Sequence, residues 1–248
     1  MKLKNIFLIP ILTLTICISS WRAVKAGSPS SSQTSSGAAL IKGVVKFTGT
    51  LPAPKPVTMS ADPSCSKQHS GPVLIREVIA DSKGGVQNVV VFVAEGLGDR
   101  TFDIPKDAAV ISQKGCQYQP HVLAMRANQT LEVQNQDPTS HNIHPTPANN
   151  REWNRAEPPG ADLKEVFSRE EISIPVKCNI HPWMRGYIAV FKHPYFAVTK
   201  EDGSFDLPSL PPGTYTVRAW HEKLGTASQT ITVGDKETKE VSFVFKSI

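Results

Sequence analysis

Cysteines, aromatic residues and long apolar runs are all scarce in this sequence. The 248 residues include 4 cysteines, and Phe, Trp and Tyr together make up 7% of the chain. The N-terminal apolar run, residues 6–18, is shorter than the roughly 20 residues that a transmembrane helix needs. We therefore expect no membrane span in the mature protein.

The chain also has little net positive charge outside its N-terminal 26 residues. Residues 1–26 hold four basic residues and no acids, so the formal charge falls by 4, from +5 to +1, without them. No other stretch of the chain is rich in Lys and Arg. A nucleic-acid partner is therefore not expected.

The N-terminus has the pattern of a secretory signal peptide. Lys2 and Lys4 precede the apolar run, and small residues around Ala26 give a cleavage site. Cys17 raises a lipoprotein alternative, which Ile16 disfavours because lipoprotein processing prefers a small residue there. An uncleaved anchor is a second alternative. We predict a signal at residues 1–26 and export to the periplasm or the extracellular space.

The cysteine count gives an odd number of thiols in an oxidising compartment. Cys17 leaves with the signal, so Cys65, Cys116 and Cys178 remain. The most economical arrangement is a Cys65–Cys116 disulfide with a free Cys178, although the sequence alone does not prove this pairing. A free thiol outside the cytoplasm usually needs a function or a protector, and a bound metal is both.

Several catalytic signatures are absent. The sequence contains no glycine-rich phosphate loop, no Ser/His/Asp arrangement and no spaced pair of carboxylates. We therefore predict that the protein is not an enzyme.

Short β-strands separated by turns account for most of the chain. Twenty prolines argue against a helical protein, and Asp202-Gly203 and Pro212-Gly213 are turn sequences. Strands rich in Val, Ile, Thr and aromatic residues are predicted at 41–47, 86–93, 130–134, 171–176, 187–191, 204–207, 214–220, 227–233 and 239–245. The fold class is predicted to be all-β, and residues 27–37 a flexible Ser/Gly linker.

The C-terminal stretch carries a motif pattern of its own. Residues 196–220 read FAVTKEDGSFDLPSLPPGTYTVRAW, with a T-x-x-D-G-x-F hairpin before L-P-P-G-x-Y. This pattern resembles the carboxypeptidase regulatory-like (transthyretin-like) β-sandwich, whose members are usually non-catalytic. We predict such a segment at 194–248. The N-terminal β segment, 38–107, supplies strands that could complete the same sandwich, in which case the middle of the chain is inserted into it.

The stretch VKCNIHPWMRGY, residues 176–187, spaces Cys178, His181 and Met184 three residues apart. About forty residues upstream lies VQNQDPTSHNIHP, which contains His141 and Asn142. Together these motifs resemble the cupredoxins, the mononuclear blue-copper proteins, over about residues 108–193. The resemblance implies a Greek-key β-sandwich beside the transthyretin-like one.

The cupredoxin resemblance also implies a ligand set for one type 1 copper. His141, Cys178 and His181 would be the three strong ligands, with Met184 as the weak axial one. Thiolate and thioether are soft donors that suit Cu(I), and imidazole suits both oxidation states. The residue at the position of Asn142 ties the two ligand loops together in the family, from the second shell of the site.

Rival metal sites fit the sequence less well. Structural zinc favours four Cys and His ligands in tight pairs, and only one cysteine lies in this loop. A dinuclear copper site needs a second cysteine there, and a multicopper oxidase needs repeated His-x-His pairs. His144 is not expected to be a ligand, because it faces away from His141 on a strand.

A Pro- and Asn-rich stretch, residues 146–163, is predicted to be a long loop. Trp153 within it is expected to cover the metal site or a partner surface. The acids that follow, Glu170 and Glu171 among them, are predicted to be solvated.

The predicted function is one-electron transfer between redox proteins whose identity the sequence does not give. In the cupredoxins the second loop histidine lies near the surface, so His181 would be the electron exit, with Pro182 and Trp183 as an apolar docking patch. The alternative is a non-enzymatic copper carrier, or a cell-envelope binding module with a vestigial copper site.

Overall fold

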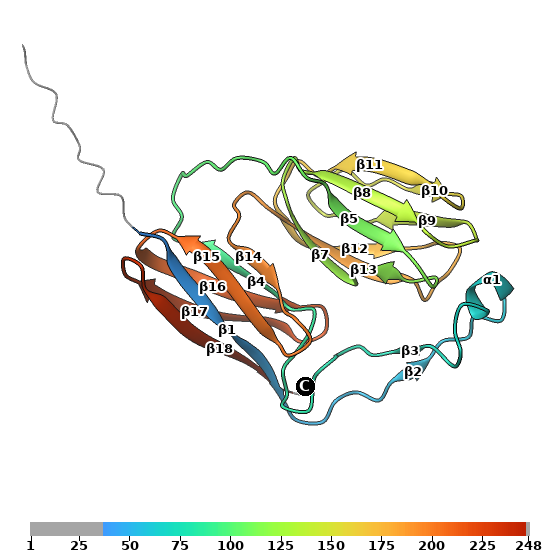
Figure 1. Ribbon diagram of the computed structural model, residues 1–248, viewed down its shortest axis with the longest axis horizontal. Helices are drawn as coiled ribbons and strands as arrows, with labels where there is room; N and C mark the ends of the chain where they lie inside the picture. The colour runs from blue at the N-terminus through green and yellow to red at the C-terminus, as the bar shows by residue number, and fades with distance from the viewer. Residues whose placement is uncertain (1–36, 247–248) are drawn as a thin grey trace, which may run out of the picture. The chain divides into compact units, whose positions relative to one another are not determined.

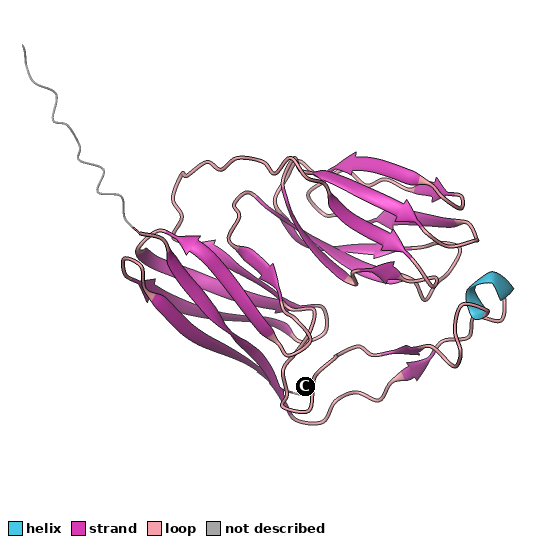
Figure 2. Ribbon diagram, in the orientation of Figure 1, coloured by secondary structure: helices cyan, strands magenta, loops and turns pink. Residues whose placement is uncertain are grey.

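The computed structural model describes residues 37–246, which form an almost entirely β-structured unit (Figure 1). The predicted signal peptide and residues 27–36 of the predicted linker lie outside the described residues. The one helix in the described range is α1 (Pro63–Ser66), a single turn (Figure 2). The all-β prediction is confirmed.

Strands from both ends of the described chain build one sandwich, here called the terminal sandwich. One sheet has the order β15 (Ser204–Leu210), β1 (Ala39–Thr48), β18 (Thr238–Lys246). The other has the order β14 (Phe196–Val198), β4 (Val90–Glu95), β16 (Gly213–His221), β17 (Gly225–Val233). In β16, Tyr215, Val217 and Ala219 alternate with more exposed residues and enter the core, as expected for a sheet with one buried face.

The strands between these segments build a second sandwich, here called the central sandwich. Its five-stranded sheet has the order β10 (Arg155–Glu157), β9 (His141–Pro145), β12 (Glu171–Lys177), β13 (Arg185–Phe191), β7 (Val122–Arg126). The facing sheet has the order β11 (Asp162–Val166), β8 (Thr130–Asn135), β5 (Ala109–Gln113), β6 (Tyr118–Gln119). Leu131, Val133 and Ile174 lie in the core between them.

A small apolar cluster joins the two sandwiches. Val90 and Phe92 of β4 pack with Val122 of β7 and Phe191 of β13, and all four are buried. The Phe92 and Phe191 rings lie 5.0 Å apart. β4 of the terminal sandwich therefore packs against β7 and β13 of the central sandwich.

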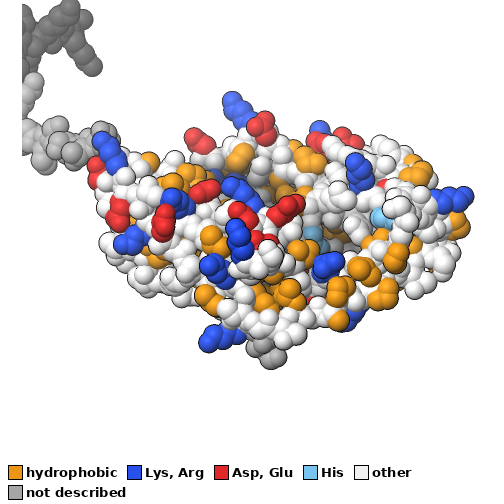
Figure 3. Space-filling model, turned by 60° about the horizontal axis from the view of Figure 1, so that its bottom comes forward, with side chains coloured by type: hydrophobic (Ala, Val, Ile, Leu, Met, Phe, Trp, Pro, Cys, Tyr) orange, Lys and Arg blue, Asp and Glu red, His pale blue; other side chains and the backbone are white. Residues whose placement is uncertain are grey.

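A long excursion between β1 and β4 leaves the terminal sandwich. It contains the short hairpin of β2 (Lys55–Pro56) and β3 (Leu74–Ile75), with α1 at its far end. Residues 59–69 of this excursion are here called the cap. The strands of this hairpin are exposed. Figure 3 turns the bottom of the Figure 1 view towards the reader, and this face shows hydrophobic side chains among Lys and Arg.

Each predicted strand overlaps an observed one, but the sequence reasoning missed others. The predicted long loop at 146–163 holds β10 and the start of β11, so that prediction is wrong. The prediction of a solvated Glu171 is also wrong. Its carboxylate is buried and accepts hydrogen bonds from the backbone N–H groups of Ala148, Asn149 and Asn150, which pins this loop to β12.

Among residues 37–246, no helix has the length and apolar character needed to cross a membrane.

The Asp202-Gly203 turn of the terminal sandwich requires glycine. Gly203 has φ +75°, and a Cβ there would lie 2.5 Å from the Val45 carbonyl oxygen. Gly225 has a similar φ of +77°, but a Cβ there meets nothing within 4 Å. Alanine substitutions at the two glycines therefore distinguish the cost of backbone strain from the cost of steric overlap.

We predict that Gly225→Ala lowers the free energy of unfolding by about 1 kcal/mol, from left-handed strain alone. Gly203→Ala should cost about 3 kcal/mol, because overlap with the backbone adds to that strain. Urea unfolding of both variants checks this. Equal losses for the two variants would contradict the close approach at Gly203.

Candidate metal centre

The Cys178–Met184 loop is a tight turn that joins β12 to β13. The Cys178 N–H donates to the Met184 carbonyl at 3.1 Å, and the Met184 N–H donates to the His181 carbonyl at 2.9 Å. The His181 N–H points at the Cys178 sulfur, with 3.4 Å between N and Sγ. The backbone therefore fixes the loop's three sulfur- or nitrogen-bearing side chains relative to one another.

His141 reaches the same place from β9. The end of β9 pairs antiparallel with the end of β12, through His144 and Lys177. The start of β9, where His141 lies, therefore runs alongside the loop that follows β12. The ligand atoms of His141, Cys178 and His181 all lie within 4.8 Å of one another. Their exposed fractions are 0%, 3% and 2%, so the group is buried.

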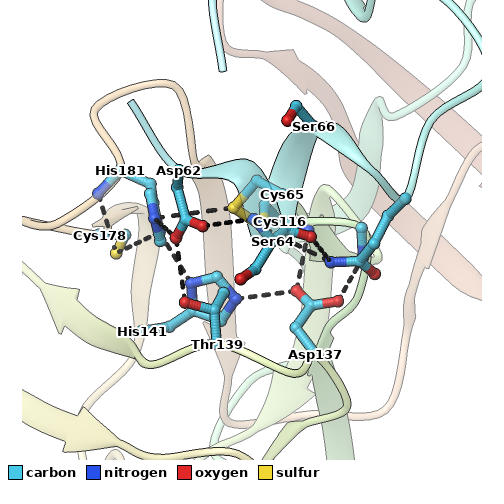
Figure 4. Close-up of a disulfide and its surroundings, with 12 residues drawn as sticks. Asp62, Ser64, Cys65, Ser66, Cys116, Asp137, Thr139, His141, Cys178 and His181 are labelled. Carbon is cyan, nitrogen blue, oxygen red and sulfur yellow. Dashed lines mark hydrogen bonds and ion pairs between the residues drawn. A yellow bond between two sulfur atoms is a disulfide. The ribbon is translucent and has the colours of Figure 1, made fainter. Parts of the chain in front are cut away.

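The two imidazoles face each other through their Nδ1 atoms, which are 2.9 Å apart. Each Nε2 atom meets a carboxylate on the other side of its ring (Figure 4). His141 Nε2 lies 2.8 Å from Asp137 Oδ2, and His181 Nε2 lies 3.0 Å from Asp62 Oδ2. A carboxylate only accepts hydrogen bonds, so both Nε2 atoms are expected to carry the proton.

This arrangement leaves two Nδ1 lone pairs pointing at one another. A neutral imidazole has one N–H, and both are used on the carboxylates. The pocket therefore needs a cation between the rings, either a proton on one Nδ1 or a metal ion. The two facing Nδ1 atoms are therefore the feature of the structure that makes the site suitable for a metal ion.

The protonation preferences agree with this interpretation. Burial opposes a charge on His141, but its hydrogen bonds to Asp137 and Cys178 outweigh burial and raise its pKa to about 9. For Cys178, burial favours the thiol, but hydrogen bonds from His141 and from nearby backbone N–H groups outweigh it and lower the pKa. Burial lowers the pKa of His181, against the hydrogen bond to Asp62. In the metal-free site these shifts favour a protonated His141 and make the Cys178 thiol easier to ionise.

The donor set matches copper better than the other common metals. Two imidazole nitrogens and one thiolate converge, and the Met184 side chain is fully buried in the same core cluster as Cys178. This combination of soft sulfur and imidazole suits Cu(I) and Cu(II), while a lone cysteine is unusual for structural zinc.

Asn142 links the two ligand-bearing loops. Its Oδ1 accepts hydrogen bonds from the Asn179 N–H at 2.7 Å and the Ile180 N–H at 3.4 Å. The same oxygen lies 3.3 Å from Cys178 Sγ. The buried Tyr118 hydroxyl donates to the Asn142 carbonyl at 2.7 Å, which holds β9 from the other side.

The cap lies directly over His181 (Figure 4). Asp62 holds Nε2, and Cys65 Sγ is 3.7 Å from the same nitrogen. Cys65 is disulfide-bonded to Cys116, which confirms the predicted pairing and leaves Cys178 free. The expectation that one side of His181 lies near the surface as an electron exit is wrong, because the cap covers that side of the ring and leaves His181 2% exposed.

The disulfide is also connected to the other histidine. Asp137 accepts hydrogen bonds from the backbone N–H groups of Gly115 and Cys116, at 2.7 and 2.8 Å, while it holds His141. These bonds fix the turn that carries Cys116. One carboxylate thus positions a proposed ligand and the anchor of the cap together.

The predicted docking residues differ in exposure. Pro182 is exposed, whereas Trp183 is half-buried and packs on His181, with 5.0 Å between ring centroids. The Trp183 indole N–H donates to the Cys116 carbonyl at 3.1 Å. Trp183 therefore belongs partly to the wall of the site.

Two further predictions concern side chains near the site. His144 contacts Glu152 at 2.6 Å and Asn179 at 3.2 Å, and it is not part of the His141–Cys178–His181 group. Trp153 does not form a partner surface. It is buried in the central core, stacks on Phe167 and belongs to the same apolar cluster as Cys178 and Met184. Of the two expectations for Trp153, the cover of a partner surface is therefore wrong.

The sequence reasoning gave no role to the acids around the two histidines. Asp137 stands four residues before His141, a spacing that signals proximity, but Asp62 is 119 residues from His181 and has no local signal. A third acid, Glu157, pairs in register with His141 and accepts a hydrogen bond from Gln113 Nε2. Burial raises the pKa of Glu157 to about 7, against the influence of His141.

Comparison with known proteins gives one family match. The carboxypeptidase regulatory-like domain matches residues 188–246, less than half of the chain. This match confirms the predicted resemblance of the C-terminal part. No curated protein matches the sequence.

Comparison with solved structures gives partial matches. A Cu-containing nitrite reductase from Thermus scotoductus SA-01 is 18% identical over 40% of this chain, with a TM-score of 0.33. This match spans only 26% of the reductase chain. A purple cupredoxin from Nitrosopumilus maritimus is 24% identical over 33% of this chain and 98% of its own, with a TM-score of 0.29. A reduced amicyanin mutant is 18% identical over 40% of this chain and 97% of its own, with a TM-score of 0.31.

Copper binding should release protons from the metal-free site. At pH 7 His141 is protonated, because its pKa is raised to about 9, and copper must displace that proton from Nδ1. We expect release of at least one proton per copper at pH 7, the one that His141 holds, because a metal ligand must be deprotonated. The contribution of His141 should fall towards zero as the pH rises through 9. A pH-indicator dye in weak buffer measures the release, and no release at pH 7 would contradict a protonated His141.

Loss of the disulfide should open the site. The Cys65–Cys116 bond spans 51 residues, a loop whose closure stabilises the folded state by about 4 kcal/mol. In the metal-free Cys65→Ala/Cys116→Ala variant, we expect alkylation of Cys178 by iodoacetamide to be much faster than in the parent protein. Ser66→Ala, an exposed change in the same helix, serves as control. An unchanged rate in the double variant would show that the cap stays closed without its tether.

Proposed function

We propose that this protein is an exported type 1 copper protein that transfers single electrons between redox partners. The observation that carries this proposal is the pair of facing Nδ1 atoms beside the Cys178 sulfur, with each ring bonded to a carboxylate through its Nε2 atom. Copper, when bound, supplies the one-electron chemistry by alternating between Cu(II) and Cu(I).

The residues present would serve such a site in distinct ways. His141, Cys178 and His181 would hold the metal, with Met184 as the weak fourth donor. Asp62 and Asp137 fix the ring orientations and favour the higher charge state of the site, since both carboxylates are negative. Asn142 and the paired strands β9 and β12 keep the two ligand loops in place, which limits rearrangement between oxidation states.

The burial of the ligands favours electron transfer over copper delivery. A carrier must exchange its metal readily with a partner, and exposed ligands make that exchange possible. Here Cys178 is 3% exposed and His181 is 2% exposed beneath a disulfide-anchored cap. Electrons can cross a thin layer of protein, whereas exchange of the metal requires the cap to open. An enzymatic role would require an open position for substrate at the metal, and four protein donors argue against one.

The disulfide is consistent with an oxidising compartment. Together with the signal-like N-terminus, it supports export to the periplasm or the extracellular space. The terminal sandwich would serve as a scaffold or docking module rather than as a catalytic domain.

Two histidines on β9 provide a matched pair of variants that tests the ligand set. His141→Gln should lose the intense visible absorption of the copper-loaded protein, because it removes one of the converging nitrogens. His144→Gln, three residues along the same strand, should retain that absorption, since His144 contacts Glu152 and Asn179 instead. Cys178→Ser should also lose the band, because the absorption arises from a thiolate–copper bond.

Circular dichroism of each variant establishes that the fold is retained. Intense absorption in Cys178→Ser, or its loss in His144→Gln alone, would contradict the ligand assignment.

A further inference from the structure

The loops around the proposed copper site carry charge of one sign on their outer side. Four segments border the site: residues 60–70, 112–121, 136–145 and 176–186. Their only carboxylates, Asp62 and Asp137, are turned inward onto the two histidines. All their cationic Lys and Arg side chains are exposed, namely Lys67, Lys114, Lys177 and Arg185.

Within residues 37–246, none of the four cations forms an ion pair. Two acids from other segments reach these loops, but they contact histidines instead: Glu152 lies on His144 and Glu222 on His121. The whole chain is far more balanced, with 27 basic and 22 acidic side chains. The site therefore has a positive rim that the composition of the chain does not require.

Direct contacts show that these segments adjoin one another. His69 Nε2 lies 2.8 Å from the Gly115 carbonyl, which brings the end of the cap beside the Lys114 turn. Trp183 donates to the Cys116 carbonyl, which brings the ligand loop to the same turn. Lys177 and Arg185 are cross-strand partners at the base of the ligand loop. We call the four cations the basic rim.

The ligand loop adds exposed apolar side chains beside the basic rim. Ile180 is 53% exposed, and Pro182 beside His181 is also exposed. Exposed apolar residues next to charged ones make up the usual anatomy of a protein docking site, with an apolar centre and a charged margin. A small surface of this kind suits the weak, short-lived encounters of redox proteins.

We infer that the basic rim and Ile180 form the docking surface for an acidic electron-transfer protein. This inference rests on the proposed function and names the chemistry of its partner. Opposite charges steer the encounter and set its orientation, and the apolar centre brings the partner against the loop that covers Cys178. A free polyanion would use the cations but would not need Ile180, so the apolar centre favours a protein.

The test uses an acidic plant-type ferredoxin as the probe and a basic cytochrome c as its counterpart. The metal-free protein, labelled with ¹⁵N, is titrated with each and its amide shifts are followed. We expect ferredoxin to shift amides of residues 112–121 and 176–186, with binding weakened about tenfold by moderate salt. Cytochrome c should leave these amides unchanged.

Two charge-reversal variants separate the rim from total charge. Changing all four rim cations to Glu should weaken ferredoxin binding by about tenfold or more. The matched control changes four exposed, unpaired lysines of the terminal sandwich to Glu, namely Lys46, Lys83, Lys236 and Lys246. The control should bind nearly as well as the parent. Ile180→Ser should also weaken binding, with all charges unchanged.

Several results would overturn the proposal: equal losses in the two charge variants, amide shifts on the terminal sandwich instead, or full binding by Ile180→Ser. Heparin shifts at the rim without ferredoxin shifts would replace the acidic protein with a polyanion. Because the titration uses metal-free protein, its outcome is separate from copper binding. Ferredoxin binding without a copper–thiolate band would leave the surface standing and remove the electron-transfer function.

Discussion

The site depends on two carboxylate–imidazole pairs that point two histidines at each other. Asp137 and Asp62 accept hydrogen bonds from the Nε2 atoms of His141 and His181, so the two Nδ1 atoms lie 2.9 Å apart beside the Cys178 sulfur. Like lone pairs at this distance are stable only with a cation between them. The rest of the central sandwich serves this geometry. Strand pairing between β9 and β12 brings the two histidines together, and burial removes the water that would otherwise separate them.

The cap restricts access to His141, Cys178 and His181. The Cys65–Cys116 bond holds Asp62 over His181, and Asp137 supports the Cys116 turn while it orients His141. The cover, the disulfide and the ring orientations are therefore one connected unit. Such a site excludes solvent and should slow exchange of a bound metal, while Pro182, next to His181 in the chain, remains exposed. That combination suits electron transfer.

The sequence predicted what local patterns encode. Alternating β-branched residues and Gly or Pro turns identified nine strands, and the spacing of Cys178, His181 and Met184 identified the loop that the structure brings to His141. Sequence reasoning failed where a residue's role is set by distant contacts. Asp62 belongs to an excursion from the terminal sandwich, and nothing in its neighbourhood points to His181. The burial of His181 and Trp153 likewise depends on segments remote in the chain.

The inward turn of the acids also explains the surface. Asp62 and Asp137 are paired with the two histidines, so the arrangement that orients the imidazoles also leaves the three lysines and the arginine of the rim without an ion pair in the described part of the chain. The most direct test of the proposed copper centre is the visible absorption spectrum of residues 27–248 titrated with Cu(II), before and after ascorbate. The structure predicts an intense thiolate–copper band that saturates at one copper per chain, bleaches on reduction and returns on reoxidation. Absence of that band, with Cys178 still titrating as a free thiol, would contradict the copper centre.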